Sequence, residues 1–171
     1  VPNGGILLNL SKRDRNREIK WADQAITSDA GCILQNVQSA AAAVGRLFPL
    51  SLASEGSCQI GGNIACNAGG LNVLRYGTMR DLVLGLEVVL PNGELMSHLA
   101  PLHKNTTGYD LRHLLIGSEG TLGIITGATV KLFAQPQTIE TAWVGVNTIG
   151  QAVELLTLIQ GHFAERLSSF E

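Results

Sequence analysis

The apolar positions of the chain predict short strands separated by turns. Residues 82–90 are almost continuously apolar, and residues 95–98 follow them after a Pro-Asn-Gly-Glu turn at 91–94. Because Asn-Gly fits the tight turns that match strand twist, this stretch predicts a β-hairpin. A second run rich in Ile, Thr and Val at 121–133 predicts another strand. Residues 6–10 read as a buried strand near the start of the chain.

Two longer segments show helical spacing. From about residue 33 to 47 the apolar positions recur every three or four residues, and an alanine run adds helix propensity. Residues 151–163 predict an amphipathic helix. Its expected inward face comprises Val153, Leu156, Ile159 and Phe163.

Smaller elements complete the pattern. Residues 18–21 and 25–28 predict a short pair of strands, and residues 142–146 predict a strand before the second helix. Residues 104–110 lead into a short helical segment that ends near Leu115. The chain therefore mixes helices and strands.

Two glycine-dense runs, residues 55–70 and 117–126, carry the candidate chemistry. So many glycines raise the entropic cost of order, and we expect neither run to be a regular helix or strand. Paired glycines such as Gly61 and Gly62 allow left-handed conformations in which successive amides point into one concavity. Such a concavity binds an anion, so the sequence predicts a phosphorylated cofactor.

Composition excludes several function classes. The chain has 171 residues, 45% of them hydrophobic, which is enough for one core. Its net charge of −2 argues against nucleic acid, which needs a positive surface. No apolar run reaches the roughly 20 residues of a membrane-spanning helix, and residues 1–5 lack the pattern of a signal peptide. Three cysteines without a Cys-x-x-Cys pair suit a reducing compartment, so we expect a cytoplasmic protein.

No residue qualifies as catalytic or metal-binding. The four histidines lack the spacing of a metal site. Ser118 directly follows Gly117, so the segment is not a serine-hydrolase elbow. The dinucleotide fingerprint of nicotinamide enzymes and the phosphate loop with its lysine are both absent from the sequence.

The glycine runs and their neighbours resemble the FAD-binding domain of FAD-linked oxidases of the vanillyl-alcohol oxidase type. The similarity is greatest to the branch of D-lactate, glycolate and D-2-hydroxyglutarate dehydrogenases. It spans nearly the whole chain in the family's order. The motifs that carry it are residues 49–52, 56–64, 67–70, 75–77, 104–111 and 117–126.

This resemblance implies a fold, a cofactor and its contacts. The expected fold is α+β, mainly the second FAD-binding subdomain with a small sheet flanked by helices. Residues 1–14 would be a remnant of the first subdomain, 15–136 the second, and 137–171 the start of a substrate-binding domain, so that the chain is truncated at both ends. The expected cofactor is FAD. Its contacts would be Ser57, Cys58, Gly61, Gly62, Cys66, Asn67, Ala68, Gly69, Glu119, Gly120, Gly123, Ile124 and Ile125.

The resemblance also implies an activity. The intact protein would oxidise a D-2-hydroxyacid by hydride transfer to the flavin, with its catalytic and metal-binding residues outside this chain. The chain alone is then expected to be inactive. Its partners would be a small-molecule substrate, a quinone, cytochrome or flavoprotein as electron acceptor, and a second copy or partner subunit. Two alternatives stay open: a non-catalytic FAD-binding subunit of a multisubunit oxidase such as glycolate oxidase, and the flavin reductase of cell-wall precursor synthesis.

Overall fold

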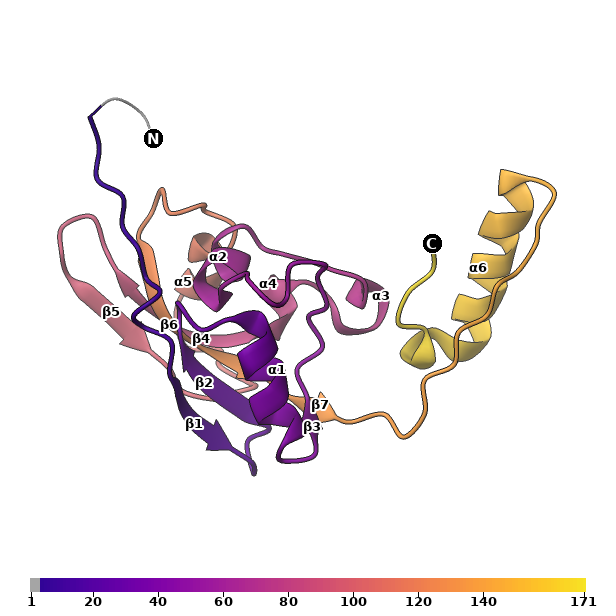
Figure 1. The fold of residues 1–171 in the computed structure, drawn as a ribbon, viewed down its shortest axis with the longest axis horizontal. Coiled ribbons are helices and arrows are strands. Elements are labelled where there is room, and N and C mark those ends of the chain that lie inside the picture. Colours follow the sequence, from indigo (N-terminus) through magenta and orange to yellow (C-terminus); the bar gives the residue numbers. More distant parts are fainter. Residues whose placement is uncertain (1–3) are drawn as a thin grey trace.

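A computed structural model describes residues 4–171. Its central part is one sheet with several short helices packed against it. The main sheet has five strands in the order β1-β2-β6-β4-β5, and every neighbouring pair is antiparallel (Figure 1). The expected α+β class is confirmed. The strands are β1 Asn16–Lys20, β2 Ala25–Asp29, β4 Val83–Val89, β5 Leu95–His98 and β6 Ile124–Lys131.

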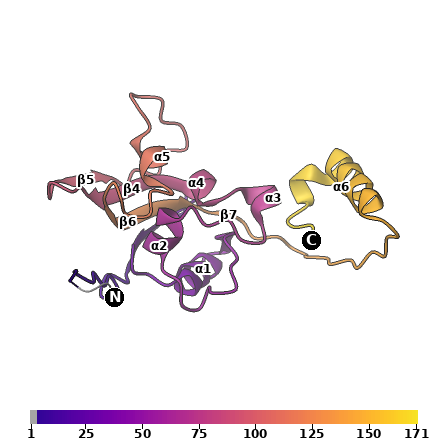
Figure 2. The same ribbon diagram turned by 90° about the horizontal axis from the view of Figure 1, so that it is seen from above.

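Helices cover both sides of this sheet. The helices α1, Leu34–Ala42, and α2, Ile60–Ala65, lie on one side, and α5, Leu111–Leu115, lies on the other (Figure 2). Two single-turn helices, α3 Val73–Tyr76 and α4 Met79–Leu82, lead from α2 into β4. A small second sheet pairs β3, Arg46–Leu47, with β7, Phe133–Ala134.

One apolar core joins these layers. The α1 side chains Leu34, Val37 and Ala41 are buried against the sheet, and α2 contributes Ile60 and Ile64. Burial of each Leu, Ile or Val side chain contributes roughly 1.5–3 kcal/mol. This packing holds α2 against the sheet, and α2 lies within the first glycine run.

A charged side chain crosses the sheet from its edge. Arg17 on β1 donates to Asp29 on β2 at 2.7 Å and to Glu87 on β4 at 2.7 Å. To reach β4 it passes over Gly127 of β6, where a Cβ atom would lie 2.8 Å from an Arg17 nitrogen. Thr126 completes the arrangement by donating to the same Glu87 carboxylate at 2.9 Å. The missing side chain at Gly127 thus allows one arginine to link three strands.

The C-terminal part is set apart from the sheet. An extended segment leads from β7 to α6, Ile149–Phe163, which is followed by the single 3₁₀ turn η1, Ala164–Arg166 (Figures 1 and 2). None of the α6 residues is buried, and its expected inward positions Val153 and Phe163 are 58% and 54% exposed. The helix itself is confirmed, and of its four expected inward residues Leu156 and Ile159 are half-buried, whereas Val153 and Phe163 are exposed.

Two predicted strands are also wrong. Residues 6–10 form no strand, and Ile6 is 97% exposed. Residues 142–146 are extended without a partner, and Trp143 is 99% exposed. A strand requires hydrogen bonds from a neighbour, and within residues 4–171 no strand runs beside either segment.

The two predicted pairs of adjacent strands are confirmed. Leu86 pairs with His98 and Val89 with Leu95 in the β4–β5 hairpin. The pair β1–β2 is likewise antiparallel, with Ile19 opposite Ile26. The helix expected to run to about residue 47 ends at Ala42, because Gly45 turns the chain with φ of +70° and the next two residues become β3.

Candidate functional site

The two glycine runs meet at the C-terminal end of α2. The amide of Gly117 donates to the carbonyl of Ile64 at 3.1 Å, and the amide of Glu119 donates to the carbonyl of Ala65 at 2.9 Å. Carbonyls in the last turn of a helix lack partners within the helix. The second run supplies donors to these carbonyls. The two runs therefore form one structural unit, although about fifty residues separate them in the sequence.

The first run departs from the expectation, because residues 60–65 are helical. The amide of Ile60 donates to Cys32 at 3.0 Å and that of Gly61 to Ala30 at 2.7 Å, so contacts with the neighbouring chain hold the first turn in place. Tertiary contacts here outweigh the low helix propensity of glycine. Gly61 and Gly62 have ordinary negative φ angles, and the predicted left-handed concavity at this pair is wrong.

These adjacent glycines have different surroundings. A Cβ at Gly61 would lie 2.7 Å from the Cβ of Ala30, so this glycine allows α2 to approach β2 closely. A Cβ at Gly62 would meet no atom within 4 Å, and Gly62 is exposed. Its amide donates to no acceptor among residues 4–171. Gly61 therefore serves packing, whereas Gly62 presents bare backbone at the surface.

Left-handed backbone does occur in the second run. The φ angles of Gly117, Glu119 and Gly120 are +81°, +50° and +78°. Thr121 closes this segment as a turn, since its amide donates to Ser118 at 3.0 Å and its hydroxyl donates to the same carbonyl at 2.6 Å. A left-handed non-glycine residue such as Glu119 is uncommon and costs free energy. The turn and the bonds to α2 together hold this conformation.

Asn67 joins the unit through its side chain. It follows α2 with φ of +51°, and its Oδ1 accepts the main-chain amide of Arg80 at 2.9 Å. The Arg80 guanidinium donates to the carbonyl of Ile116 at 2.6 Å and also to that of His113. Arg80 therefore lies between the first run and the segment that leads into the second.

The predicted cofactor residues divide into three groups by exposure. The buried ones are closely packed: Gly61 lies against Ala30, Gly123 lies against Val88, and Ile125 lies in the core. The half-buried ones are Cys58, Asn67, Ala68 and Gly69. The exposed ones are Ser57, Gly62, Cys66, Glu119, Gly120 and Ile124.

Sequence reasoning missed Arg80. The prediction depended on the spacing of glycines and on sequence motifs, and Arg80 lies between two of these motifs. The partners of the guanidinium are main-chain carbonyls 33 and 36 residues away, which no local pattern marks. The only local signal is the Thr78–Asp81 capping box, which predicts a helix start at this point.

The carboxylates of Asp29 and Glu87, which lie in the sheet, are both paired with Arg17. Burial opposes ionisation of Asp29, but hydrogen bonds and the charge of Arg17 outweigh it and lower the pKa of this carboxyl. The hydrogen bond from Arg17 likewise lowers the pKa of Glu87 despite its burial. Burial raises the pKa of the Cys32 thiol. These groups stay in their ordinary charge states near neutral pH and act in the fold.

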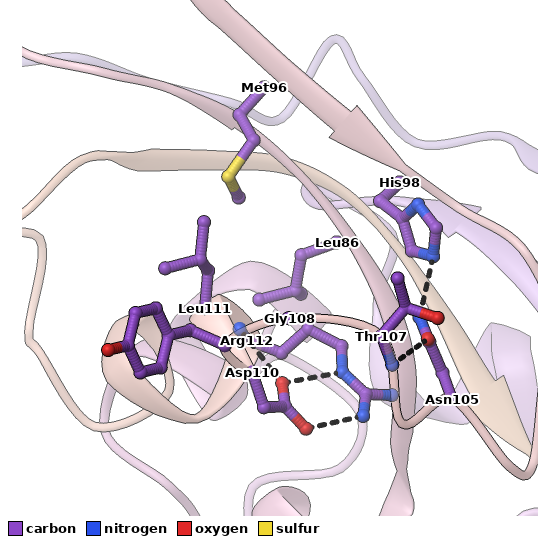
Figure 3. A pocket seen from close by; sticks show the side chains of 10 residues that line it. Leu86, Met96, His98, Asn105, Thr107, Gly108, Asp110, Leu111 and Arg112 are labelled. Atoms are coloured by element: carbon purple, nitrogen blue, oxygen red, sulfur yellow. Dashed lines mark hydrogen bonds and ion pairs between the residues drawn. The ribbon is translucent and has the colours of Figure 1, made fainter.

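A cavity of about 240 Å³ lies between the β4–β5 hairpin and the loop before α5 (Figure 3). Arg112 binds the Asp110 carboxylate through two nitrogens at 2.9 and 2.6 Å, and this hydrogen bonding lowers the pKa of Asp110 to about 2. Asn105 contacts His98 at 3.3 Å across the opening. The lining residues belong to neither glycine run, and the cavity's main charges neutralise each other.

Comparison with known proteins identifies the family. Residues 1–98 match the family model described as an FAD binding domain. The chain belongs to this family. It is 45% identical over 146 residues to a mitochondrial D-2-hydroxyglutarate dehydrogenase of Danio rerio, covering 85% of this chain and 27% of that protein. It is 39% identical over 166 residues to a D-2-hydroxyglutarate–pyruvate transhydrogenase of Saccharomyces cerevisiae, covering 97% of the chain and 34% of the relative.

Solved structures support the fold. An alkyldihydroxyacetonephosphate synthase superposes with a TM-score of 0.66 at 24% identity, covering 75% of this chain and 23% of that one. This likeness confirms the predicted fold, and the match to the FAD binding domain model confirms the expected cofactor. The chain spans about a third or less of the length of the curated relatives named above.

The expected cytoplasmic location is contradicted. Relatives from Danio rerio, Bos taurus and Oryza sativa are named mitochondrial proteins. A cysteine count suited to a reducing environment does not distinguish the cytosol from a mitochondrial compartment, so that inference was too narrow.

No helix within residues 4–171 has the length and hydrophobicity needed to cross a membrane. Within the same range, no group of three or more His, Cys, Asp or Glu side chains is arranged to hold a metal ion.

Proposed function

We propose that this chain is the FAD-binding portion of a flavin-dependent oxidoreductase that oxidises a D-2-hydroxyacid. The observation that carries the proposal is the joining of the two glycine runs at the end of α2, in a chain of the FAD-binding family. The substrate class is supported by relatives named D-2-hydroxyglutarate dehydrogenase, which are 45% and 44% identical over 146 residues.

The exposed backbone of the unit suits the diphosphate of FAD. Main-chain amides are good donors to phosphate oxygens. Gly62 offers an amide without a protein acceptor among residues 4–171 and no side chain in front of it. Gly120 is similarly open, since a Cβ there would meet no atom within 4 Å. We infer that these two positions allow the cofactor to contact the main chain directly.

The thirteen predicted contact residues would then act in two ways. The exposed residues, of which Ser57, Cys66 and Glu119 are examples, would touch the cofactor. The buried residues Gly61 and Gly123 would act indirectly, by letting α2 and the second run approach the sheet. This division refines the single list that the resemblance implies.

The chemistry follows from the cofactor class. When bound, FAD supplies the acceptor for a hydride removed from the alcohol carbon of the substrate. The residues of this chain bind the cofactor, orient it and exclude water from its contacts. We assign them no proton transfer: the titratable side chains among the predicted contacts are Cys58, Cys66 and Glu119, and the proposed role of each is binding.

D-2-hydroxyglutarate is the first substrate to test, with D-lactate and glycolate beside it. Reduction of the bound flavin by each acid, followed without oxygen as loss of the oxidised-flavin absorbance in the full-length protein, tests the proposal. We expect rapid reduction by at least one of the three acids and, for D-2-hydroxyglutarate or D-lactate, little reduction by the L-enantiomer. A flavoprotein that none of the three acids reduces would refute the proposed activity. A protein that takes up no flavin at all would refute the cofactor site.

The electron acceptor, the location and the oligomeric state are separate parts of the proposal. The relatives named mitochondrial favour a mitochondrial protein, which cell fractionation tests. Turnover with quinone, cytochrome or flavoprotein acceptors and the mass in solution test the remaining two.

A further inference from the structure

Arg80 is held firmly by its own short helix. It lies in α4, where Asp81 accepts the amide of Thr78 at 2.8 Å and so forms a capping box. The amide of the preceding residue, Met79, donates to the carbonyl of Ala68 at 2.9 Å. Two consecutive amides, those of Met79 and Arg80, thus bind residues of the first glycine run, which fixes where the Arg80 side chain begins.

The guanidinium reaches to the other run. It donates to the carbonyls of Ile116 and His113, at the end of α5 and directly before Gly117. These carbonyls belong to the last turn of a helix and need donors. At Gly117 a Cβ would lie 3.4 Å from both an Arg80 nitrogen and the Cβ of Asn67, so the three residues are packed together.

The charge of Arg80 is not neutralised locally. Within residues 4–171 no carboxylate lies within ion-pair distance of it, whereas Arg17 and Arg112 are each paired with a carboxylate. A positive charge bound only to carbonyls raises the local potential and favours a nearby anion. The charge of Arg80 therefore favours a phosphate group beside the two runs.

We propose that Arg80 is a positioning residue, which holds residues 117–120 against the end of α2 in the arrangement that FAD binding requires. The inference rests on the proposed function, because it assumes that the joined runs are the cofactor site. Arg80 acts by holding residues 117–120 in place and by the electrostatic field of its guanidinium. It need not touch the cofactor.

Three variants test this role. Arg80→Met removes the donors and the charge while keeping an unbranched side chain. Arg80→Lys keeps the charge, but a single ammonium cannot reproduce the planar fork of donors. Arg46→Met is the matched control, since Arg46 lies on β3 away from both runs and contacts the Trp21 ring at 5.2 Å (Figure 1).

Two measurements are made on each variant: the FAD dissociation constant of the apoprotein, and amide hydrogen exchange without FAD. We expect Arg80→Met to raise the dissociation constant roughly tenfold to a hundredfold, the effect of losing one or two charge-assisted hydrogen bonds. Arg80→Lys should fall between it and the parent protein, and Arg46→Met should match the parent. Exchange should accelerate at the amides of Gly117 and Glu119 in Arg80→Met and stay unchanged in β6.

The exchange measurement separates this inference from the proposed function. Unchanged exchange at Gly117 and Glu119 in Arg80→Met would overturn the positioning role, whatever the cofactor does. Faster exchange with unchanged FAD affinity would also overturn it, because the loop position would not matter to the cofactor. A parent protein that binds no FAD would refute the proposed cofactor site, and with it the claim that Arg80 serves FAD binding. General unfolding of Arg80→Met, seen as faster exchange throughout β4 and β6, would assign Arg80 to the fold and refute the proposal.

Discussion

Adjacent glycines in α2 provide a direct test of how the site is built. We predict that Gly61→Ala destabilises the protein and that Gly62→Ala does not. Both residues are helical, so the gain in helix propensity from replacing glycine, about 0.5–1 kcal/mol, is similar in the two variants. The difference between them then isolates the contact of the new methyl group with its surroundings.

The size of that difference follows from distances in the structure. The Cβ at Gly61 would lie 2.7 Å from the Cβ of Ala30 and 3.1 Å from its carbonyl oxygen. Carbon atoms in good contact are about 3.5–4.0 Å apart, so α2 or β2 must shift by roughly 0.8 Å or more. Such overpacking costs about 1–3 kcal/mol. At Gly62 the corresponding space is empty.

Thermal unfolding of the two apoprotein variants measures this difference. For a chain of this size, about 1–3 kcal/mol corresponds to a Tm difference of roughly 2–12 °C, with Gly62→Ala the more stable. FAD titration of the same samples adds a second prediction, which is weaker FAD binding by Gly62→Ala in spite of its stability. Equal Tm values would refute the packing role of Gly61. Unchanged FAD affinity in Gly62→Ala would remove Gly62 from the proposed site.

Three further predictions concern the second run and the ion pairs. Gly120→Pro should raise the FAD dissociation constant on the order of tenfold to a thousandfold, because proline cannot adopt the φ of +78° found there; turnover should recover at saturating FAD, and lost turnover with unchanged affinity would place the loop in the reaction. Asp29→Asn should lower the free energy of unfolding by about 2–4 kcal/mol, since it removes a carboxylate that is 1% exposed and leaves Arg17 without one of its partners; urea denaturation measures this, and a loss below about 0.5 kcal/mol would contradict it. Asp110 and Asp29 both have pKa values lowered by folding, so their stabilisation is complete above the ordinary aspartate pKa of about 4 and is lost as the pH falls from there toward the folded value, about 2 for Asp110; unfolding midpoints measured from pH 5 to pH 2 should fall, and for Asp110→Asn they should fall less steeply.

The sequence allowed correct prediction where the determinants were local. The β4–β5 hairpin depends on an apolar run and on Asn92-Gly93, where Gly93 has φ of +85°. Of the four apolar positions expected at helical spacing, Leu34, Val37 and Ala41 are buried on α1, whereas Val44 lies beyond its end and is 39% exposed. Motif spacing also indicated the FAD-binding family, which the family match confirms. In the hairpin and in α1, a short stretch contains enough information to define its own structure, whereas the family resemblance depends on motifs spread over the chain.

Prediction failed where the determinants were distant. The first glycine run was expected to be irregular, but bonds from Ile60 and Gly61 to residues about thirty positions earlier start a helix there. Residues 6–10 have the composition of a strand without a partner beside them. The role of Arg80 depends on two carbonyls beyond β4 and β5. Composition and spacing do not encode such pairings directly. The thirteen contact residues and the two domain boundaries stay predictions.

The arginine that crosses Gly127 has a consequence for how the sheet unfolds. An edge strand such as β1 normally frays first, because only one side of it is hydrogen-bonded. Here Arg17 connects β1 with Asp29 and Glu87, so detaching the strand would leave a buried carboxylate without its main counter-charge. The edge strand β1 is thereby coupled to the middle of the sheet. We expect β1 to unfold in the same cooperative step as β4 and β6. The surface on which α2 and the second glycine run are built then persists until the whole sheet is lost.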